Sequence, residues 1–172
     1  MLGKLIPEVN FRTRVRDEKL TGDNPFKWLS VSTDDLFANK KVILFSLPGA
    51  FTPTCSTFQL PDFEKLFSSF KEKGIDKIYC LSVNDAFVMN AWAKHQKISN
   101  IEVIPDGSGE FTRKMGMLVN KDNLGFGFRS WRYAALIVDK KIEKWFEEPG
   151  YSDNHDEDPY QISSPQNVLA NI

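Results

Sequence analysis

The chain has few cysteines, few histidines and no long hydrophobic run. Its 172 residues include two cysteines, Cys55 and Cys80, and two histidines. Two cysteines are too few for a disulfide framework, and no group of Cys and His has the spacing of metal ligands. No apolar run approaches the ~20 residues that a membrane-spanning helix needs, and the opening residues lack the features of a secretory signal. We therefore expect a soluble intracellular protein without metal, cofactor or membrane contact. Its place would be the cytoplasm, or an organelle lumen (mitochondrion or plastid) if a presequence has been removed.

Neither basic nor acidic residues are in large excess. The chain carries 22 Lys and Arg against 23 Asp and Glu, which gives a formal net charge of −1. One basic stretch contains Arg12, Arg14 and Arg16, but Asp17 and Glu18 interrupt it. Nucleic-acid binding needs clustered cations that displace counterions from phosphates. We therefore expect no nucleic-acid partner and interpret these arginines as the solvated face of a strand.

The chain has the composition and length of one ordinary domain. It is 41% hydrophobic and 26% charged, which is typical of soluble globular proteins. A chain of this length buries roughly 70% of the surface that its unfolded form exposes, which is enough for one sizeable core. Because no repeat and no low-complexity linker divides it, we expect a single domain over residues 1–172.

Apolar runs and helical periodicity alternate along the first part of the chain. The runs 41–47 and 77–83 are short and apolar, which indicates strands buried on both faces. Helical spacing follows each of them, over 56–74 with a kink or restart near Pro61, and over 85–96. Further strands are expected at 101–106, 132–139 and 141–148, the last two joined by a hairpin at Asp139-Lys140. This order predicts an α/β fold with a central mixed sheet flanked by helices.

Cys55 stands between an expected strand and an expected helix. The turn-rich segment PGAFTPT separates it from the strand, and helical periodicity begins with the next residue. In sulfur chemistry the thiolate is the nucleophile, and a free cysteine, with a pKa near ~8.5, is mostly protonated at neutral pH. A helix N-terminus offers unpaired N–H groups and the positive end of the helix dipole, which favour an anion. This position therefore predicts a reactive cysteine.

The segment around Cys55 resembles one family in particular. PGAFTPTC matches the PxxxTxxC signature of peroxiredoxins at Pro48, Thr52 and Cys55, and the form PGAFTPTCS is similar to the Prx5 subfamily. Further similarity to that subfamily lies in CLSVNDAFVMNAW, in FRSWRYAALIVD and in the opening KLIPEV, so that it covers nearly the whole chain. The resemblance implies a thioredoxin-like fold and a thiol peroxidase that reduces hydrogen peroxide and organic hydroperoxides.

The resemblance also implies roles for individual residues. Cys55 would be the peroxidatic cysteine, which becomes a sulfenic acid, and Thr52 the hydroxyl that orients the peroxide. Pro48 would shield the sulfur, and Arg132 would support the thiolate and the developing negative charge. Fixed donors that meet developing charge lower a barrier more than they stabilise bound substrate. The backbone N–H groups of Gly49 and Cys55 are candidates to join these donors.

Two further residues, Arg129 and Gln59, bear on the roles that the resemblance implies. Arg129 lies three residues before Arg132, and we prefer Arg132 because it directly precedes the apolar strand, as the family's arginine does. Many relatives carry a histidine four residues after the peroxidatic cysteine, whereas this chain has Gln59. A glutamine amide can form hydrogen bonds but cannot titrate.

The sulfenic acid must meet a thiol to be restored. Some relatives carry a resolving cysteine near the C-terminus, but no cysteine follows Cys80 here. Cys80 falls inside an expected buried strand, where a cysteine usually acts as a small core residue. We therefore expect a one-Cys enzyme that takes its reducing thiol from outside, from glutathione or a glutaredoxin.

Two other functions stay open at this point. A redox sensor would use the oxidation of Cys55 to change its binding to another protein. A cysteine hydrolase or transferase would pair Cys55 with His95 as base, but the pattern of Thr52 and Arg132 would then have no explanation. We interpret both histidines, His95 and His155, as surface residues.

Two further segments could suggest a ligand site, but we expect neither to bind a dinucleotide or a calcium ion. The stretch GFGF at 125–128 lacks the third glycine of a dinucleotide site, and its aromatic residues, Phe126 in particular, are candidates for a homodimer interface. The acidic segment 151–159 is expected to be a loop, and its part 153–158 lacks the Gly and bidentate Glu of an EF-hand, so we expect it to be solvated. A short final helix is expected after Ser164 as its N-cap.

Overall fold

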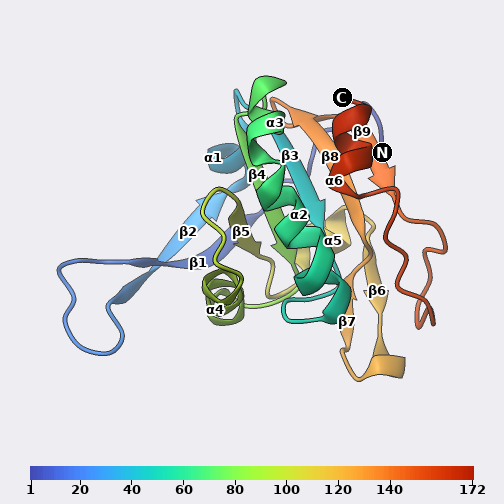
Figure 1. Ribbon diagram of the computed structural model, residues 1–172. Coiled ribbons are helices and arrows are strands. Elements are labelled where there is room, and N and C mark those ends of the chain that lie inside the picture. Colours follow the sequence, from blue (N-terminus) through green and yellow to red (C-terminus); the bar gives the residue numbers. More distant parts are fainter.

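The centre of the molecule is a five-stranded mixed sheet (Figure 1). The computed structural model describes residues 1–172. The strand order is β5-β4-β3-β8-β9; β3, β4 and β5 are parallel, and β8 is antiparallel to both of its neighbours. These strands are β3 (Lys41–Ser46), β4 (Lys77–Ser82), β5 (Glu102–Pro105), β8 (Tyr133–Val138) and β9 (Lys141–Glu147). The predicted central mixed sheet is confirmed.

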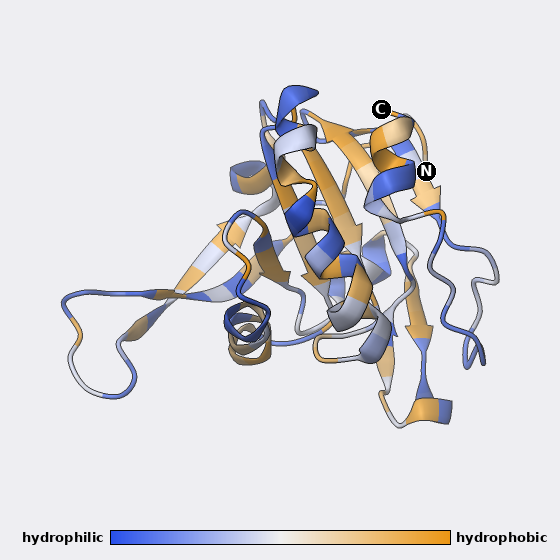
Figure 2. Ribbon diagram, in the orientation of Figure 1, coloured by the Kyte–Doolittle hydropathy of each residue, from blue (hydrophilic) through white to orange (hydrophobic).

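Helices cover both faces of this sheet. They are α1 (Thr33–Phe37), the π-helical turn η1 (Cys55–Gln59), α2 (Leu60–Lys65), α3 (Phe67–Glu72), α4 (Ala86–Gln96), α5 (Glu110–Lys114) and α6 (Pro165–Ala170). A further 3₁₀ turn, η2 (Asp122–Leu124), has no buried residue and lies between β6 and β7. Side chains from η1, α2, α3, α4 and α6 pack on one face, and those from α1 and α5 on the other. Because successive residues of a strand point to opposite faces, Leu44 and Phe45 of β3 belong to different cores. Figure 2 shows the central strands as largely hydrophobic for this reason.

The helix that contains Cys55 changes from π-helical to α-helical geometry near Pro61, where a kink or restart was predicted. It begins with the π-helical turn, in which the Leu60 N–H donates to the Cys55 carbonyl, five residues back. A wider turn before Pro61 gives room to its ring, which otherwise presses on a carbonyl of the preceding turn. A second break, at Leu66 between α2 and α3, was not predicted. The last helical turn is followed by Gly74, whose φ of +77° terminates the helix as expected.

Three hairpins complete the structure, and only one of them was predicted. At the turn between β8 and β9, Asp139 and Lys140 have φ of 45° and 68°, as a type I′ turn requires. The two hairpins that the sequence analysis missed are β1 (Asn10–Arg16) with β2 (Phe26–Ser32), and β6 (Leu118–Asn120) with β7 (Phe128–Ser130). The first projects from the body at the left of Figure 1 and carries the arginine stretch on β1.

No helix of the structure has the length and apolar character needed to cross a bilayer.

Candidate active site

Cys55 lies in the first turn of its helix, beyond the carboxyl end of β3. The loop 47–54 leads from β3 to it, and its thiol is free and fully buried. Asn84, in the loop after the neighbouring strand β4, holds this loop in place. Its Oδ1 accepts hydrogen bonds from the Ala50 N–H at 3.0 Å and from the Ser82 hydroxyl at 2.7 Å. The sequence analysis did not single out Asn84, although the ends of adjacent parallel strands are where such residues gather.

Arg132 reaches Cys55 from the start of β8. The register of β8 and β3 places the first residue of β8 opposite Ser46, the last residue of β3, and so brings the arginine to the edge of the sheet that carries the cysteine. Nη1 of Arg132 lies 3.5 Å from Sγ of Cys55, and the arginine is 1% exposed. Arg129 instead donates to the Val83 carbonyl at 2.6 Å. The fold therefore brings Arg132, and not Arg129, to the sulfur.

Three further side chains surround the guanidinium of Arg132. Nη1 also donates to Oε1 of Gln59, and Nη2 pairs with Oδ1 of Asp158 at 2.5 Å. The Tyr160 ring centre lies 5.6 Å from the guanidinium carbon. Burial by itself disfavours the charged form, but the negative charges of Cys55 and Asp158 outweigh burial and raise the pKa of Arg132. A permanent cation therefore lies in the interior beside the sulfur.

Asp158 corrects the interpretation of the acidic segment 151–159. The segment is a loop, as expected, and most of its side chains are exposed. Asp158, however, is 48% exposed and forms an ion pair with a buried cation, so the segment is more than a solvated loop. The pair joins residues 26 positions apart, and no local pattern indicates it. Only a physical argument could have indicated a residue such as Asp158: an arginine expected to be buried beside the sulfur needs a negatively charged partner.

Pro48, Gly49 and Thr52 lie in the loop before Cys55. The Thr52 hydroxyl donates to the Gly49 carbonyl at 2.8 Å and is not bonded to the sulfur. A Cβ at Gly49 would lie 3.2 Å from Cγ2 of Thr52, so a larger residue there would require the threonine methyl group to shift by a few tenths of an ångström. Pro48 is buried, and with Thr52 it lines a hollow of about 410 Å³. The other residues that line this hollow are Pro53, Thr54, Lys121, Leu124, Phe126, Asp156, Glu157 and Asp158.

The two histidines lie apart from the sulfur. His95 is exposed on α4, with its ring centre 5.8 Å from that of Phe51, and His155 packs edge-on against Trp131 at 5.4 Å. Neither ring forms a hydrogen bond with Cys55, whose only side-chain hydrogen bond comes from an arginine. The structure therefore offers no support for a hydrolase with a histidine base.

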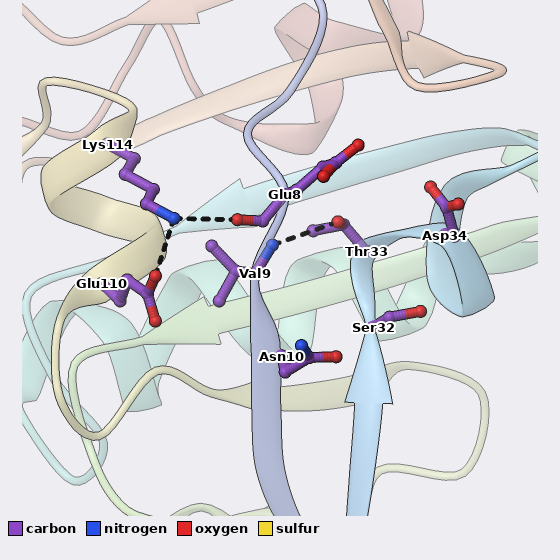
Figure 3. Close-up of a pocket in the computed structure, with 8 residues that line it drawn as sticks. All are labelled: Glu8, Val9, Asn10, Ser32, Thr33, Asp34, Glu110 and Lys114. Carbon is purple, nitrogen blue, oxygen red and sulfur yellow. Dashed lines mark hydrogen bonds and ion pairs between the residues drawn. The ribbon is translucent and has the colours of Figure 1, made fainter.

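A hollow of about 460 Å³ elsewhere on the surface is lined by Glu8, Val9, Asn10, Ser32, Thr33, Asp34, Glu110 and Lys114 (Figure 3). Within it, Lys114 pairs with Glu110 at 2.7 Å and donates to the Glu8 carbonyl at 2.9 Å. It contains neither cysteine nor histidine. The smaller hollow of about 410 Å³ is not lined by a cysteine either, but part of its wall is formed by Pro48, Thr52 and Thr54 of the loop that leads to Cys55.

The chain is similar to known proteins along nearly its whole length. The Redoxin family model matches residues 5–161. A peroxiredoxin of Rhizobium etli is 69% identical over 166 residues, which make up 96% of this chain and 93% of the relative. The chain belongs to the peroxiredoxin family. The resemblance seen in the sequence is thereby confirmed.

Two further peroxiredoxins refine this assignment. The hybrid peroxiredoxin hyPrx5 of Haemophilus influenzae is 52% identical over 169 residues, 98% of this chain and 65% of the relative. The crystal structure of the Plasmodium falciparum antioxidant protein, a 1-Cys peroxiredoxin, superposes with a TM-score of 0.90 at 41% identity and covers 98% of this chain and 97% of that chain. The thioredoxin-like fold is confirmed. As a peroxiredoxin, the protein is an oxidoreductase that reduces a peroxide at the expense of a thiol.

Proposed function

We propose that this peroxiredoxin reduces hydrogen peroxide and organic hydroperoxides through a sulfenic acid on Cys55, and that glutathione or a glutaredoxin restores it. The observation that supports this best is the 3.5 Å contact between Nη1 of Arg132 and the buried sulfur. A cation at this distance attracts a thiolate far more strongly than a neutral thiol, and low exposure limits screening by water. The contact thus favours the thiolate, the form of the cysteine that attacks a peroxide.

In the first step, a lone pair of the Cys55 thiolate attacks the terminal oxygen of ROOH. An S–O bond forms and the O–O bond breaks; the alkoxide leaves with the bonding electrons and takes up a proton, which yields Cys55–SOH and ROH. Negative charge moves from sulfur to the leaving oxygen during this step. We assign to Arg132 the stabilisation of both charge distributions, because fixed donors that meet developing charge lower the barrier.

The loop before the cysteine is assigned to bind the peroxide. Because the Thr52 hydroxyl donates its proton to the Gly49 carbonyl, its lone pairs remain available to accept from the peroxide O–H. The backbone N–H groups of Gly49 and Cys55 are assigned to the peroxide oxygens, and the Pro48 ring to the exclusion of water from the sulfur. The hollow of about 410 Å³ above this loop has the size of a small-molecule site.

The sulfenic acid is proposed to be restored by thiols from outside the chain. A first thiol RSH forms the mixed disulfide Cys55–S–SR and releases water; a second thiol then forms RSSR and releases the Cys55 thiolate. Cys80 lies in the core as predicted, and burial above all, then the charge of Cys55, raises the pKa of Cys80. A buried thiol that keeps its proton is a poor resolving nucleophile. The description of the Plasmodium falciparum relative as 1-Cys supports the same mechanism.

The proposed use of an external thiol also indicates where in the cell the protein acts. Glutathione is kept reduced inside cells, and thiols there are not converted to stable disulfides. The proposed reductant therefore goes together with an intracellular location.

The test is stopped-flow tryptophan fluorescence of the reduced protein mixed with hydrogen peroxide and with cumene hydroperoxide. Cys55→Ser removes the proposed nucleophile, and Cys80→Ser is the matched control, since it removes the other thiol. We expect rapid oxidation of the wild type and of Cys80→Ser, none of Cys55→Ser, and steady turnover when glutathione and glutaredoxin are added. Oxidation no faster than that of free cysteine would overturn the proposal. Rapid oxidation without recycling by any thiol would favour a redox sensor.

We further propose that residues 1–172 form one domain that assembles as a homodimer. The two apolar cores lie on opposite faces of one sheet, which supports a single domain. Phe51 and Phe58, in the Cys55 loop and in η1, are 51% and 53% exposed, and such exposed apolar side chains are typical of interfaces. Phe126 is half-buried against Arg129 at 5.7 Å and is the weaker test position.

Sedimentation velocity tests the assembly. The wild type should sediment as a dimer, and Phe58→Ser should shift it toward the monomer by removing apolar area from the interface. A monomeric wild type would contradict the homodimer directly, and an unaltered dimer in Phe58→Ser would place the interface elsewhere.

A further inference from the structure

We infer that Asp158 is the standing counterion of Arg132 and that it favours the stages of the catalytic cycle in which the Cys55 sulfur carries no charge. The inference rests on the proposed function for the cycle itself. Its structural basis is the 2.5 Å ion pair between Nη2 of Arg132 and Oδ1 of Asp158, on the side of the guanidinium that does not face the sulfur. With the carboxylate in place the Arg132 side chain is only 1% exposed, so its charge is balanced mainly by groups of the protein and not by water.

The charge on Cys55 changes during the cycle, while the charge on Arg132 does not. The sulfur carries a negative charge before attack and none as a sulfenic acid or a mixed disulfide. A cation buried without an anion is strongly disfavoured, and in the uncharged stages Asp158 is the anion bonded to it. In the thiolate stage two anions share one cation and repel each other. Removal of the carboxylate should therefore stabilise the thiolate relative to the neutral forms.

No other charged group takes the place of Asp158. Gln59, which bonds the other amino group of the guanidinium, is neutral. Burial raises the pKa of Tyr160 and of Cys80, so both keep their protons. Glu148 forms no ion pair with Arg132, and one of its carboxylate oxygens accepts hydrogen bonds from the backbone of residues 161 and 163. The remaining charged groups that face the site are Lys121, Asp62, Asp156 and Glu157.

The chain provides a matched control next to Asp158. Glu157 belongs to the same acidic segment and lines the same hollow, but it forms no ion pair or hydrogen bond with Arg132. Glu157→Gln therefore removes one negative charge from the same region and leaves the pair intact. Asp158→Asn removes the charge and keeps an oxygen that can accept from Nη2, whereas Asp158→Glu keeps the charge on a longer side chain.

The decisive measurement is the pH dependence of the alkylation of Cys55 by iodoacetamide, followed by mass spectrometry of the peptide that contains it. Only the thiolate reacts at an appreciable rate, so the midpoint of the profile reports the stability of the thiolate. In Asp158→Asn we expect the midpoint to fall by about 0.5 to 1 pH unit, because a half-exposed carboxylate is partly screened. Glu157→Gln should stay within about 0.2 unit of the wild type, and Asp158→Glu should return toward it.

A second measurement uses an equilibrium in place of a rate. In buffers of glutathione and glutathione disulfide, Cys55–SH and GSSG exchange to Cys55–S–SG and GSH. A stabilised thiolate makes the mixed disulfide a stronger oxidant. The constant for formation of the mixed disulfide should therefore fall about three- to tenfold in Asp158→Asn, the same factor as the midpoint shift.

The outcomes separate the inference from the proposed function. An unchanged midpoint in Asp158→Asn would overturn the inference, and so would an upward shift, which would mean that Asp158 chiefly orients Arg132. If the wild type fails to react with peroxide, the proposed function fails, while the alkylation profile still reports on Asp158. Circular dichroism and thermal unfolding of each variant show that it is folded, and Asp158→Ser, which also removes the charge, repeats the test if Asp158→Asn does not fold.

Discussion

Replacement of Arg132 by glutamine should slow the oxidation of Cys55 by peroxide by roughly two orders of magnitude. The change removes the cation whose Nη1 lies 3.5 Å from the sulfur. It also leaves the carboxylate of Asp158 near the thiolate with no positive charge between them. Both effects disfavour the thiolate, and the first also removes support for the charge that develops on the leaving oxygen.

The magnitude follows from the geometry. Two unit charges at the 3.5 Å separation seen here interact by about 5 kcal/mol at an effective dielectric constant of ~20. The guanidinium charge is spread over three nitrogens and is shared with Asp158, so we assign about half of this, ~2.5 kcal/mol, to the barrier. At about 1.4 kcal/mol per factor of ten, the rate constant should fall roughly 60-fold.

Stopped-flow fluorescence measures this rate constant, and the fold supplies a local reporter. Nε1 of Trp92 donates to the hydroxyl of Ser56 at 3.0 Å, next to the cysteine in the chain. Arg129→Gln is the matched control, because this second, half-buried arginine bonds a backbone carbonyl and does not touch the sulfur. The control should stay within about threefold of the wild type. If folded Arg132→Gln also stays within threefold, the electrostatic reasoning is refuted.

Three further predictions concern the surroundings of the sulfur. Thr52→Val should lower the rate constant with hydrogen peroxide about 10- to 100-fold and Thr52→Ser much less; equal rates for both variants would remove the hydroxyl from the mechanism. Cys80→Ala should leave peroxidase turnover unchanged and lower the free energy of unfolding in urea by about 1 kcal/mol, whereas lost turnover would contradict a one-Cys cycle. Gln59→Leu removes the amide that accepts from Arg132 and should cost about 1 to 3 kcal/mol in the same unfolding assay; unaltered stability would show that the guanidinium finds another acceptor.

The strands of the central sheet could be predicted because their signals are local. The runs 41–47 and 77–83 are apolar without alternation, as strands covered on both faces must be. The hairpin at Asp139-Lys140 was predicted from its turn residues. The hairpin of β6 and β7 escaped prediction because its strands have three residues each, too few for a period of two to be visible. The hairpin of β1 and β2 was obscured by a long charged connection between its strands.

The chain by itself was enough to predict Cys55 as the reactive cysteine and to identify the loop that leads to it. The turn segment before Cys55 and the helix after it are contiguous in sequence, so spacing alone places the sulfur at a helix N-terminus. Gln59 one turn later was visible for the same reason. Contacts within one loop and one helix are made by residues close together in the chain, and a sequence pattern can predict such contacts.

Only the tertiary structure decided which charges surround the sulfur. The choice between Arg132 and Arg129 depends on the register of β8 against β3, and the role of Asp158 depends on the path of a loop that returns across the site. Both contacts join residues far apart in the chain, and each forms because a buried cation needs a partner where water is excluded. Desolvation and charge pairing act through space, so they could be assigned only once the fold had brought these side chains together.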